Sequence, residues 1–251
     1  MSISFYPKLP YSGPYSGDGS GLTFPYFSAY QDGYTQLTAA ITGPSTTTPI
    51  QVTSTAGFPS SGYIAIEEEI IGYTTTTPTT FDGTITRGAL GTSAGKSAHA
   101  IGKYVTEAAA APVGTSVPMR ISVVTLSNGI TCTTPDTKIY FTNAGIYNIQ
   151  FSAQLLNYST GDNVTIWIKQ NGFDVADTAG DQYVPAKHAS TPGAALPAWN
   201  YLLQMAAGDH IEFYWHSDTG ETVLATYPPN SGTTHPSSPS LIVTATFVSA
   251  V

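Results

Sequence analysis

The stretch Tyr147-Asn148-Ile149-Gln150-Phe151-Ser152-Ala153-Gln154-Leu155 decides the fold class. Its odd-numbered positions are apolar and its even-numbered positions are polar. Successive side chains of a strand point to opposite faces, so this alternation predicts a strand with one face in a core. The same alternation recurs at Val164, Ile166 and Ile168, at Ile211, Phe213 and Trp215, and at Leu241, Val243, Ala245 and Phe247. We therefore expect residues 112–251 to form an antiparallel sandwich or jelly roll of about eight strands.

Composition narrows the class of protein further. The chain has 251 residues, of which 24 are Gly and 18 are Pro, and only 10% are charged. Gly and Pro interrupt helices, so these counts favour an all-β fold. Sixteen acidic against eight basic residues give a net charge of −8, which argues against a nucleic-acid partner. No stretch approaches the roughly 20 apolar residues of a membrane span, so we expect no membrane partner either.

Residues 1–37 are predicted to form an extended arm. Gly and Pro separate its many aromatic residues, and the segment shows neither strand nor helix periodicity. Such a segment builds no core of its own, and its rings need an apolar partner. The candidate attachment residues are Phe5, Tyr6, Tyr11, Tyr15, Phe24, Tyr26 and Phe27. The arm either grips a neighbouring protein or folds back on its own body.

Residues 38–111 are predicted to form a small all-β module. Short strand-like runs alternate there with turns: Ile50-Gln51-Val52, Tyr63-Ile64-Ala65-Ile66, Ile70-Ile71-Gly72-Tyr73 and Thr84-Ile85-Thr86-Arg87. Turn signals at this spacing are typical of short antiparallel strands. Ala108-Ala109-Ala110-Ala111 followed by Pro112 breaks the pattern, so we place the boundary between the module and the jelly roll there.

Few residues point to catalysis or to a cofactor. Glu67-Glu68-Glu69 is the densest charge run, but adjacent strand side chains diverge, so we expect a solvated turn in preference to a cation site or a general acid pair. Asp174, Asp177 and Asp181 share a polar loop, which is either a calcium site or a plain acidic surface. No Gly-x-Ser-x-Gly turn and no His-Glu-x-x-His pattern occurs. We therefore expect no enzyme activity, no cofactor and no metal.

Cysteine, histidine and tryptophan leave narrower alternatives. Cys132 is the single cysteine, which excludes an internal disulfide and a Cys-based zinc site. His210 and His216 share a strand face by parity, where a metal or pH-sensitive contact competes with ordinary polar positions. The tryptophans Trp167, Trp199 and Trp215 either form a stacking platform for sugars or pack against a neighbouring subunit.

Two stretches of residues 112–251 resemble the C1q/tumour-necrosis-factor jelly-roll superfamily. One is Ile139-Tyr140-Phe141-Thr142-Asn143-Ala144-Gly145-Ile146-Tyr147-Asn148-Ile149-Gln150-Phe151, and the other is Leu203-Gln204-Met205-Ala206-Ala207-Gly208-Asp209-His210-Ile211-Glu212-Phe213. Gly145 and Gly208 suit tight turns, and Asp209 can accept backbone hydrogen bonds. The resemblance implies a homotrimer packed through aromatic strands. Its expected interface residues are Tyr147, Phe151, Phe213, Trp215 and Phe247.

The middle segment resembles small β modules of bacteriophage virion proteins. The distinctive spacings are Phe58-Pro59-x-x-Gly62 and Arg87-Gly88-x-x-Gly91-Thr92. Arm, module and jelly roll in this order resemble an accessory protein of a phage particle. The N-terminus lacks a signal-peptide pattern, which suits a virion protein assembled in the host cytoplasm. We expect a non-enzymatic decoration or cement protein that binds the major capsid protein or another virion protein, or alternatively a fibre protein that binds host surface glycans.

Overall fold

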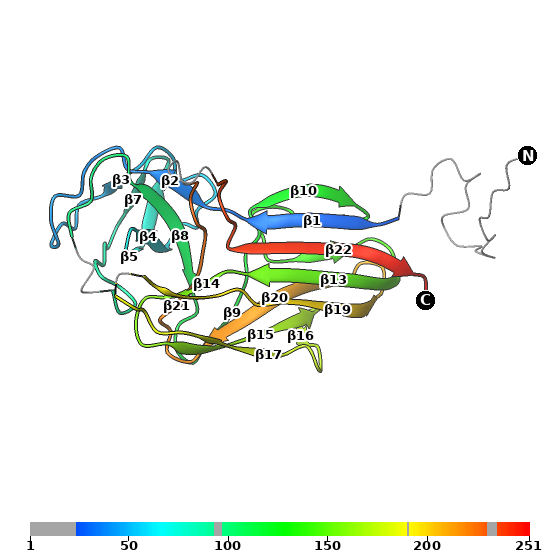
Figure 1. Ribbon diagram of the computed structural model, residues 1–251. Helices are drawn as coiled ribbons and strands as arrows, with labels where there is room; N and C mark the ends of the chain where they lie inside the picture. The colour runs from blue at the N-terminus through cyan, green and yellow to red at the C-terminus, as the bar shows by residue number, and fades with distance from the viewer. Residues whose placement is uncertain (1–23, 93–96, 190, 230–234) are drawn as a thin grey trace, which may run out of the picture.

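The computed structural model describes residues 24–92, 97–189, 191–229 and 235–251. Within them the chain forms strands β1 to β22 and no helix. The paired strands run antiparallel in several sheets, which confirms the expected all-β class. Figure 1 shows an elongated molecule with the small module at one end and the sandwich at the other.

One layer of the sandwich is a five-stranded sheet. Across the sheet lie β10 (Val123–Asn128), β1 (Tyr26–Gln31), β22 (Leu241–Ser249), β13 (Gly145–Ala153) and β19 (Ala198–Met205). The alternating stretch from Tyr147 onward lies in β13, where it pairs with β22 on one side and with β19 on the other. This strand ends at Ala153, so Leu155 already belongs to the next strand and to another sheet.

The facing layer is a seven-stranded sheet. Its main path is β11 (Ile130–Thr131), β12 (Ile139–Phe141), β20 (His210–Ser217), β15 (Asp162–Gln170) and β16 (Phe173–Asp174). Two short strands complete it: β17 (Gly180–Val184) pairs with β15, and β9 (Ser116–Pro118) pairs with β20. The longest pairing joins β15 to β20 from Val164 opposite Ser217 to Gln170 opposite Ile211.

The chain passes back and forth between these two layers. β13, β19 and β22 lie in the five-stranded sheet, whereas β12, β15 and β20 lie in the seven-stranded one. Such winding between two facing antiparallel sheets is a jelly roll. The inward side chains fill one shared core, in which Phe141, Tyr147, Ile166, Phe213 and Trp215 are buried. Burying each large apolar side chain contributes roughly 1.5–3 kcal/mol, so this core holds the two layers together.

The module has a smaller core of its own. A three-stranded sheet of β3 (Ile50–Gln51), β7 (Thr80–Asp82) and β6 (Thr75–Thr77) packs in it. Its buried side chains include Leu37, Ile64, Ile71, Phe81 and Val105. The strand expected at Thr84 to Arg87 is reduced to one bridge, in which Thr86 pairs with Gly72.

A third sheet joins the module to the jelly roll. Its order is β18 (Gly193–Ala195), β14 (Leu155–Asn157), β21 (Thr222–Ala225), β8 (Tyr104–Ala110), β4 (Gly62–Ile66) and β5 (Glu69–Tyr73), and β2 (Tyr34–Gln36) also pairs with β8. β8 bonds to β4 of the module and to β21 of the jelly-roll segment. Three alanines of the expected boundary, Ala108 to Ala110, thus lie in a shared strand, and the strand ends before Ala111 and Pro112.

The expected arm is shorter than 1–37. Residues 26–31 form β1 between β10 and β22, and Phe27 is buried in the jelly-roll core. Tyr26 stays partly exposed, whereas Phe24 stacks on Phe247 with ring centroids 6.0 Å apart. Residues 26–31 form a strand because Phe27 and Ala29 alternate with polar or exposed residues and face inward. This short alternation is hard to see in the sequence because Gly and Pro dominate the residues before it. Phe5, Tyr6, Tyr11 and Tyr15 lie outside the described residues.

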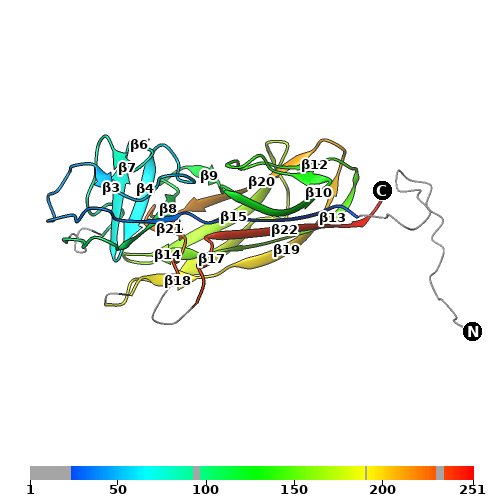
Figure 2. The same cartoon turned by 90° about the horizontal axis from the view of Figure 1, so that it is seen from above.

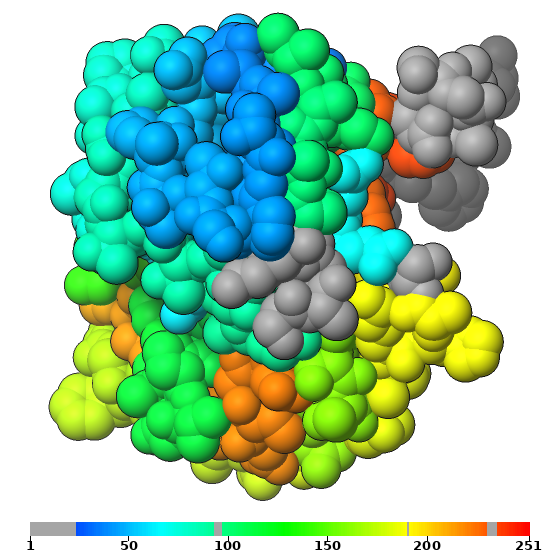
Figure 3. All heavy atoms as spheres, turned by 90° about the vertical axis from the view of Figure 1, so that its left-hand side faces the viewer, coloured from blue at the N-terminus to red at the C-terminus, as the bar shows by residue number. Residues whose placement is uncertain are grey.

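The module is an insertion within the jelly roll. The chain completes β1, enters the module, and returns to the same sheet at β10. Seen from above, β1 runs beside β22 along the length of the sandwich (Figure 2). The junction is tied by the buried Glu107, which accepts from Gln31 and from Arg120. From the module's end, jelly-roll loops lie directly below the module (Figure 3).

Candidate functional site

The residues expected at a subunit interface point into the protomer instead. Tyr147, Phe151, Phe213 and Trp215 are buried in the jelly-roll core, and Phe247 is partly buried against Tyr147. The expectation of an interface at these residues is therefore wrong. Alternation identified them as one face of each strand, but that face lines the space between the two sheets. A surface that contacts another molecule is therefore formed by the outward-facing residues that alternate with them along each strand.

The outward side of the five-stranded sheet is free of charge; we call it the uncharged face. None of its five strands contains Asp, Glu, Lys, Arg or His. Its large exposed side chains are mainly aliphatic: Leu126, Leu202, Ile242 and Val248, with Tyr26. Polar groups between them are amides and hydroxyls, such as Gln150 and Thr244. Protein interfaces are depleted of charge at their centres, so this face has the composition of one.

The outward side of the seven-stranded sheet differs; we call it the charged face. Its strands carry ionisable side chains, which include Lys169, Asp174, Asp181, His210 and His216. The large apolar side chains exposed on these strands are aromatic: Tyr140, Phe173 and Tyr183. The inward neighbours Val164, Ile166 and Ile168 are fully buried, so the charges are confined to the outer surface.

A cluster around Trp167 lies in the middle of the charged face. Trp167 donates from Nε1 to Asp174 Oδ1 over 2.7 Å, and Lys169 Nζ lies 3.4 Å from the same oxygen. The Trp167 ring packs beside Tyr214, with centroids 6.0 Å apart at 37°. The Lys169 ammonium sits 4.5 Å above the Tyr214 ring. We refer to these four residues, Trp167, Lys169, Asp174 and Tyr214, as the Trp167 cluster.

The three tryptophans do not form one platform. Trp215 is buried, and Trp199 lies in the edge strand β19, partly buried against the core. A Cβ on Gly180 would lie 2.6 Å from the Trp199 ring, so only glycine lets β17 approach it. Trp199 meets Phe151 edge to face at 5.4 Å and lines a shallow hollow of about 430 Å³ with Gln150 and Asn200. Trp167 alone lies on the charged face.

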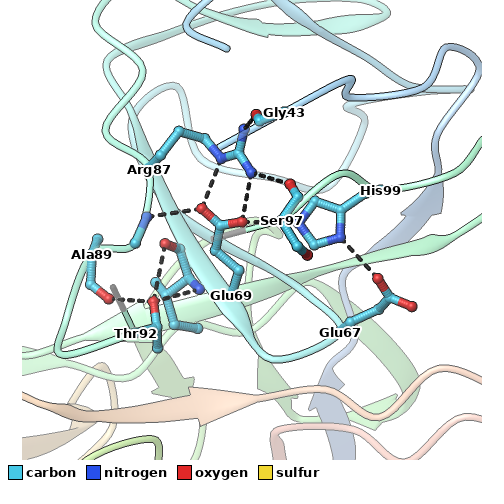
Figure 4. A network of polar contacts seen from close by, with 10 residues as sticks. Gly43, Glu67, Glu69, Arg87, Ala89, Thr92, Ser97 and His99 are labelled. Carbon is cyan, nitrogen blue, oxygen red and sulfur yellow. Dashed lines mark hydrogen bonds and ion pairs between the residues drawn. The ribbon is translucent and has the colours of Figure 1, made fainter. Parts of the chain in front are cut away.

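Glu69, the last residue of the Glu67-Glu68-Glu69 run, belongs to a buried ionic network (Figure 4). Glu69 is fully buried, and Arg87 grips it with Nε and Nη2, both at 2.7 Å. His99 lies between Glu69 and Glu67, 2.9 Å from each. The expectation of a solvated turn is thus wrong for Glu69, because the left-handed backbone at Glu67 turns the following strand so that Glu69 faces inward.

The network fixes the charge of its members. Burial opposes ionisation of Glu69, but hydrogen bonds from His99 and Arg87 outweigh it and lower its pKa to about 2. Burial also opposes a charge on His99, yet its bonds to Glu69 and Glu67 raise its pKa. Arg87 further donates to the carbonyls of Gly43 and Ser97, both at 2.7 Å. These contacts tie three loops of the module together, which is a structural role.

The remaining candidates do not assemble into a catalytic or metal site. Asp174 bonds to Trp167, whereas Asp181 accepts from Thr165 at 2.6 Å. Within the described ranges, no group of three or more His, Cys, Asp or Glu side chains could hold a metal ion. His216 bonds to the Thr115 carbonyl, and His210 packs against Tyr140. Cys132 is half-buried, and burial raises its pKa to about 11, so its thiol is unreactive.

The turn residues behave largely as expected. Gly208 has a φ of 89°, and Asp209 accepts from the Ala206 amide at 2.7 Å, which confirms their roles in the turn before β20. Gly145 serves a different purpose. It begins β13, and a Cβ there would lie 2.4 Å from the Phe247 ring. The glycine therefore permits close packing of β22 on β13 and not a turn.

Comparison with known proteins adds no relative to this picture. No protein-family model matches the chain, and no curated protein matches it in sequence. Among the described residues, no helix has the length and apolar character needed to cross a membrane.

Proposed function

We propose that this chain is a structural protein of a tailed bacteriophage particle, in the form of a homotrimeric capsid decoration or cement protein. Its N-terminal segment would anchor it to the major capsid protein or to another virion protein. The resemblance of residues 38–111 to virion modules supports the phage assignment. The jelly-roll resemblance of residues 112–251 supports the trimer.

The uncharged face is the observation that carries the structural role. Exposed aliphatic side chains on a flat sheet are costly in water, and contiguous patches of them mark interaction sites. Leu202, Leu126 and Ile242 lie on one such sheet, without a charge in any of its strands. A partner of the same composition, such as another copy of this chain, would bury them without leaving an ion unpaired. The proposed subunit contact therefore moves from the inward aromatic residues to this outward set.

The positions of the chain ends shape the proposed attachment. Tyr26 pairs with Thr246, so the described chain begins beside its own C-terminal strand (Figure 1). The module lies at the opposite end of the sandwich. An anchor in residues 1–23 would thus hold the jelly-roll end to the particle and leave the module pointing away. Three such anchors on one trimer would act multivalently, which slows release.

We propose a binding role for the chain and not a catalytic one. Two members of the Glu67-Glu68-Glu69 run are held by cations: Glu67 by Lys103 at 2.5 Å and Glu69 by Arg87 at 2.7 Å. A general acid needs a carboxyl with a raised pKa, whereas the pKa of Glu67 and of Glu69 is lowered, so this run of carboxylates does not supply one. For Glu67 the bond from Lys103 is the largest cause.

A fibre protein that recognises host surface glycans is the second candidate. The Trp167 cluster favours it, because a fixed ring among polar groups is suited to a sugar. The number of copies per particle separates the two roles. Many copies spread over the shell support decoration, whereas a few copies confined to the tail support the fibre.

Mass measurement and particle binding test the proposal. By native mass spectrometry we expect one species at three times the 26.3 kDa of the single chain. A chain lacking residues 1–23 keeps β1 and should still form this trimer, but it should no longer attach to particles. A full-length chain that stays monomeric, or a truncated chain that still attaches, contradicts the proposal.

A further inference from the structure

We infer that the charged face binds a neutral saccharide, with Trp167 as the stacking platform. This inference does not depend on the chain being a virion protein, because it rests only on the outer surface of the seven-stranded sheet. It also differs from the subunit contact, since the uncharged face lies on the other side of the sandwich. Both surfaces could therefore be occupied at once.

The Trp167 ring is held in place before any ligand arrives. Its Nε1–H is fixed by Asp174, and its edge is supported by Tyr214. Lys169 covers the Tyr214 ring, so Trp167 is the aromatic surface of the cluster that remains open, and it is partly exposed. A side chain that is already ordered loses little conformational entropy on binding, which favours affinity.

Hydrogen-bonding groups flank the ring on the same face. Thr165 precedes Trp167 by two positions on β15 and stands opposite His216 on one side and Asp181 on the other. Asn163, two positions further, is exposed. The Asp181 carboxylate receives one bond from Thr165 and can accept several more. The face therefore combines one apolar ring with fixed acceptors and donors, which is how small polar ligands are oriented.

Aromatic rings among carboxylates suit a saccharide. A sugar ring offers a face of weakly positive C–H groups, which matches the negative face of an aromatic ring, and its hydroxyls can donate to carboxylates. The charged face exposes Tyr140, Phe173 and Tyr183, and the carboxylates of Asp174 and Asp181 are exposed on the same sheet. A protein partner that covered the rings would also bury these carboxylates, which is costly unless each one is paired. The arrangement thus fits a saccharide better than a peptide.

Charge restricts the saccharide to a neutral one. Asp174, Asp181 and Asp218 are exposed on or beside this face, whereas Lys169 is engaged by Asp174 and Tyr214. The whole chain carries a net charge of −8. An anionic sugar at Trp167 would meet the like charge of these carboxylates, so its approach is disfavoured.

The extent of the face favours a chain of sugars over a single one. His210, Tyr214 and His216 lie on one side of β20, and a strand rises about 3.4 Å per residue, so the row spans roughly 20 Å. Tyr140 continues the row beside His210, with ring centroids 5.2 Å apart. The probes of choice are therefore oligosaccharides.

Calorimetric titration of the full-length protein tests the inference. The probes are neutral hexasaccharides of glucose, of mannose and of N-acetylglucosamine, with a hexamer of galacturonate as the anionic counterpart. We expect at least one neutral probe to bind and the galacturonate hexamer to bind more weakly. Trp167→Ala should weaken the neutral probe by about tenfold, and Trp167→Phe, which keeps a smaller ring, by less.

Trp199→Phe is the matched control. It keeps an aromatic ring against Gly180 and should leave the affinity unchanged, because Trp199 lies at the edge between the sheets. Circular dichroism and native mass establish that each variant keeps its fold and assembly. Three results overturn the inference: no neutral probe binds at millimolar concentration, Trp167→Ala binds as well as the parent chain, or the galacturonate hexamer binds more tightly than every neutral probe.

Discussion

The two outer faces of the jelly roll are built alike and differ in chemistry. Both arise from strands with strict alternation, and both cover the same core. The strands of the five-stranded sheet contain no Asp, Glu, Lys, Arg or His, and their exposed apolar residues are mainly aliphatic, whereas the seven-stranded sheet combines carboxylates, a lysine and histidines with exposed aromatic rings. The inner faces decide the fold, and the outer faces decide what the molecule can touch.

The difference teaches that parity separates the roles of neighbouring residues. Phe151 fills the core and Gln150 beside it faces outward, although both belong to β13. A substitution one position along a strand therefore tests a different property of the molecule. Inward substitutions should therefore change the stability of the fold, and outward ones should change association or ligand binding.

The largest effect is expected in the core. Phe213→Ala removes a buried ring that packs on Phe151 with centroids 4.9 Å apart. We expect the free energy of unfolding to fall by about 3–5 kcal/mol, because the cavity between the sheets cannot close. Chemical denaturation followed by tryptophan fluorescence measures this loss. If the variant kept its stability but assembled differently, Phe213 would belong to a subunit interface and not to the core.

A charge on the uncharged face should disrupt assembly. Leu202→Asp places a carboxylate where no partner cation exists in the sheet, and burying it unpaired in a subunit contact is costly. We expect the dissociation constant of the assembly to rise by about 100-fold, or roughly 3 kcal/mol, measured by sedimentation equilibrium. Leu196→Asp is the matched control, since Leu196 is 65% exposed, close to the 66% of Leu202, but lies outside the strands of this sheet. Equal effects of both changes would refute the assignment of the face.

The stability of the fold should depend on pH through Asp162, a buried carboxyl of the seven-stranded sheet. Asp162 lies in β15, and although burial opposes its ionisation, bonds from Ser217, Thr222 and Thr219 lower its pKa. A lowered carboxyl pKa stabilises the fold above the unfolded value of about 3.9, and this stability is lost as the pH falls through the folded value. Asp162→Asn should cost about 2 kcal/mol at pH 7, because its amide presents N–H groups to donors.

Denaturation of the parent chain and of Asp162→Asn across pH measures this difference. The gap in unfolding free energy should close as the pH drops below the lowered pKa, since the parent carboxyl is then also neutral. The proposed association through the uncharged face should stay constant over the same range while the fold persists, because its strands hold no Asp, Glu, Lys, Arg or His, and tyrosine ionises only at much higher pH. A constant gap at all pH values would exclude an electrostatic role for Asp162.

Periodicity was sufficient to predict the fold class and the strands of the sandwich. The alternating stretches around Tyr147, Ile166, Phe213 and Val243 all lie in strands of the jelly roll. Alternation does not say whether the apolar side faces the other sheet or another subunit, so the expected interface was assigned to the wrong parity. β1 was missed because only Phe27 and Ala29 mark its inward side within a segment dominated by turn-forming residues upstream.

The candidate sites were less predictable, because they depend on contacts between distant residues. Loops of the module bring Glu69, Arg87 and His99 together. The sequence gives no spacing that predicts this contact, and shows only that charged residues are few. Asp174 was considered as a calcium ligand, yet it bonds to Trp167 seven positions earlier across a hairpin. The sequence did contain a signal for this contact. Asn171-Gly172 favours a tight hairpin turn, and such a turn brings Trp167 on one side of it close to Asp174 on the other.

The smallest expected effect compares one exposed residue from each face. Ile242→Ala removes aliphatic surface from the uncharged face, and Tyr183→Ala removes an aromatic ring from the charged face. If the uncharged face is the subunit contact, Ile242→Ala should raise the dissociation constant by about fivefold, or roughly 1 kcal/mol. Tyr183→Ala should leave it unchanged, although it removes the larger and more exposed side chain. Sedimentation equilibrium of the two variants measures the difference directly, and a larger effect from Tyr183→Ala would reverse the roles of the two faces.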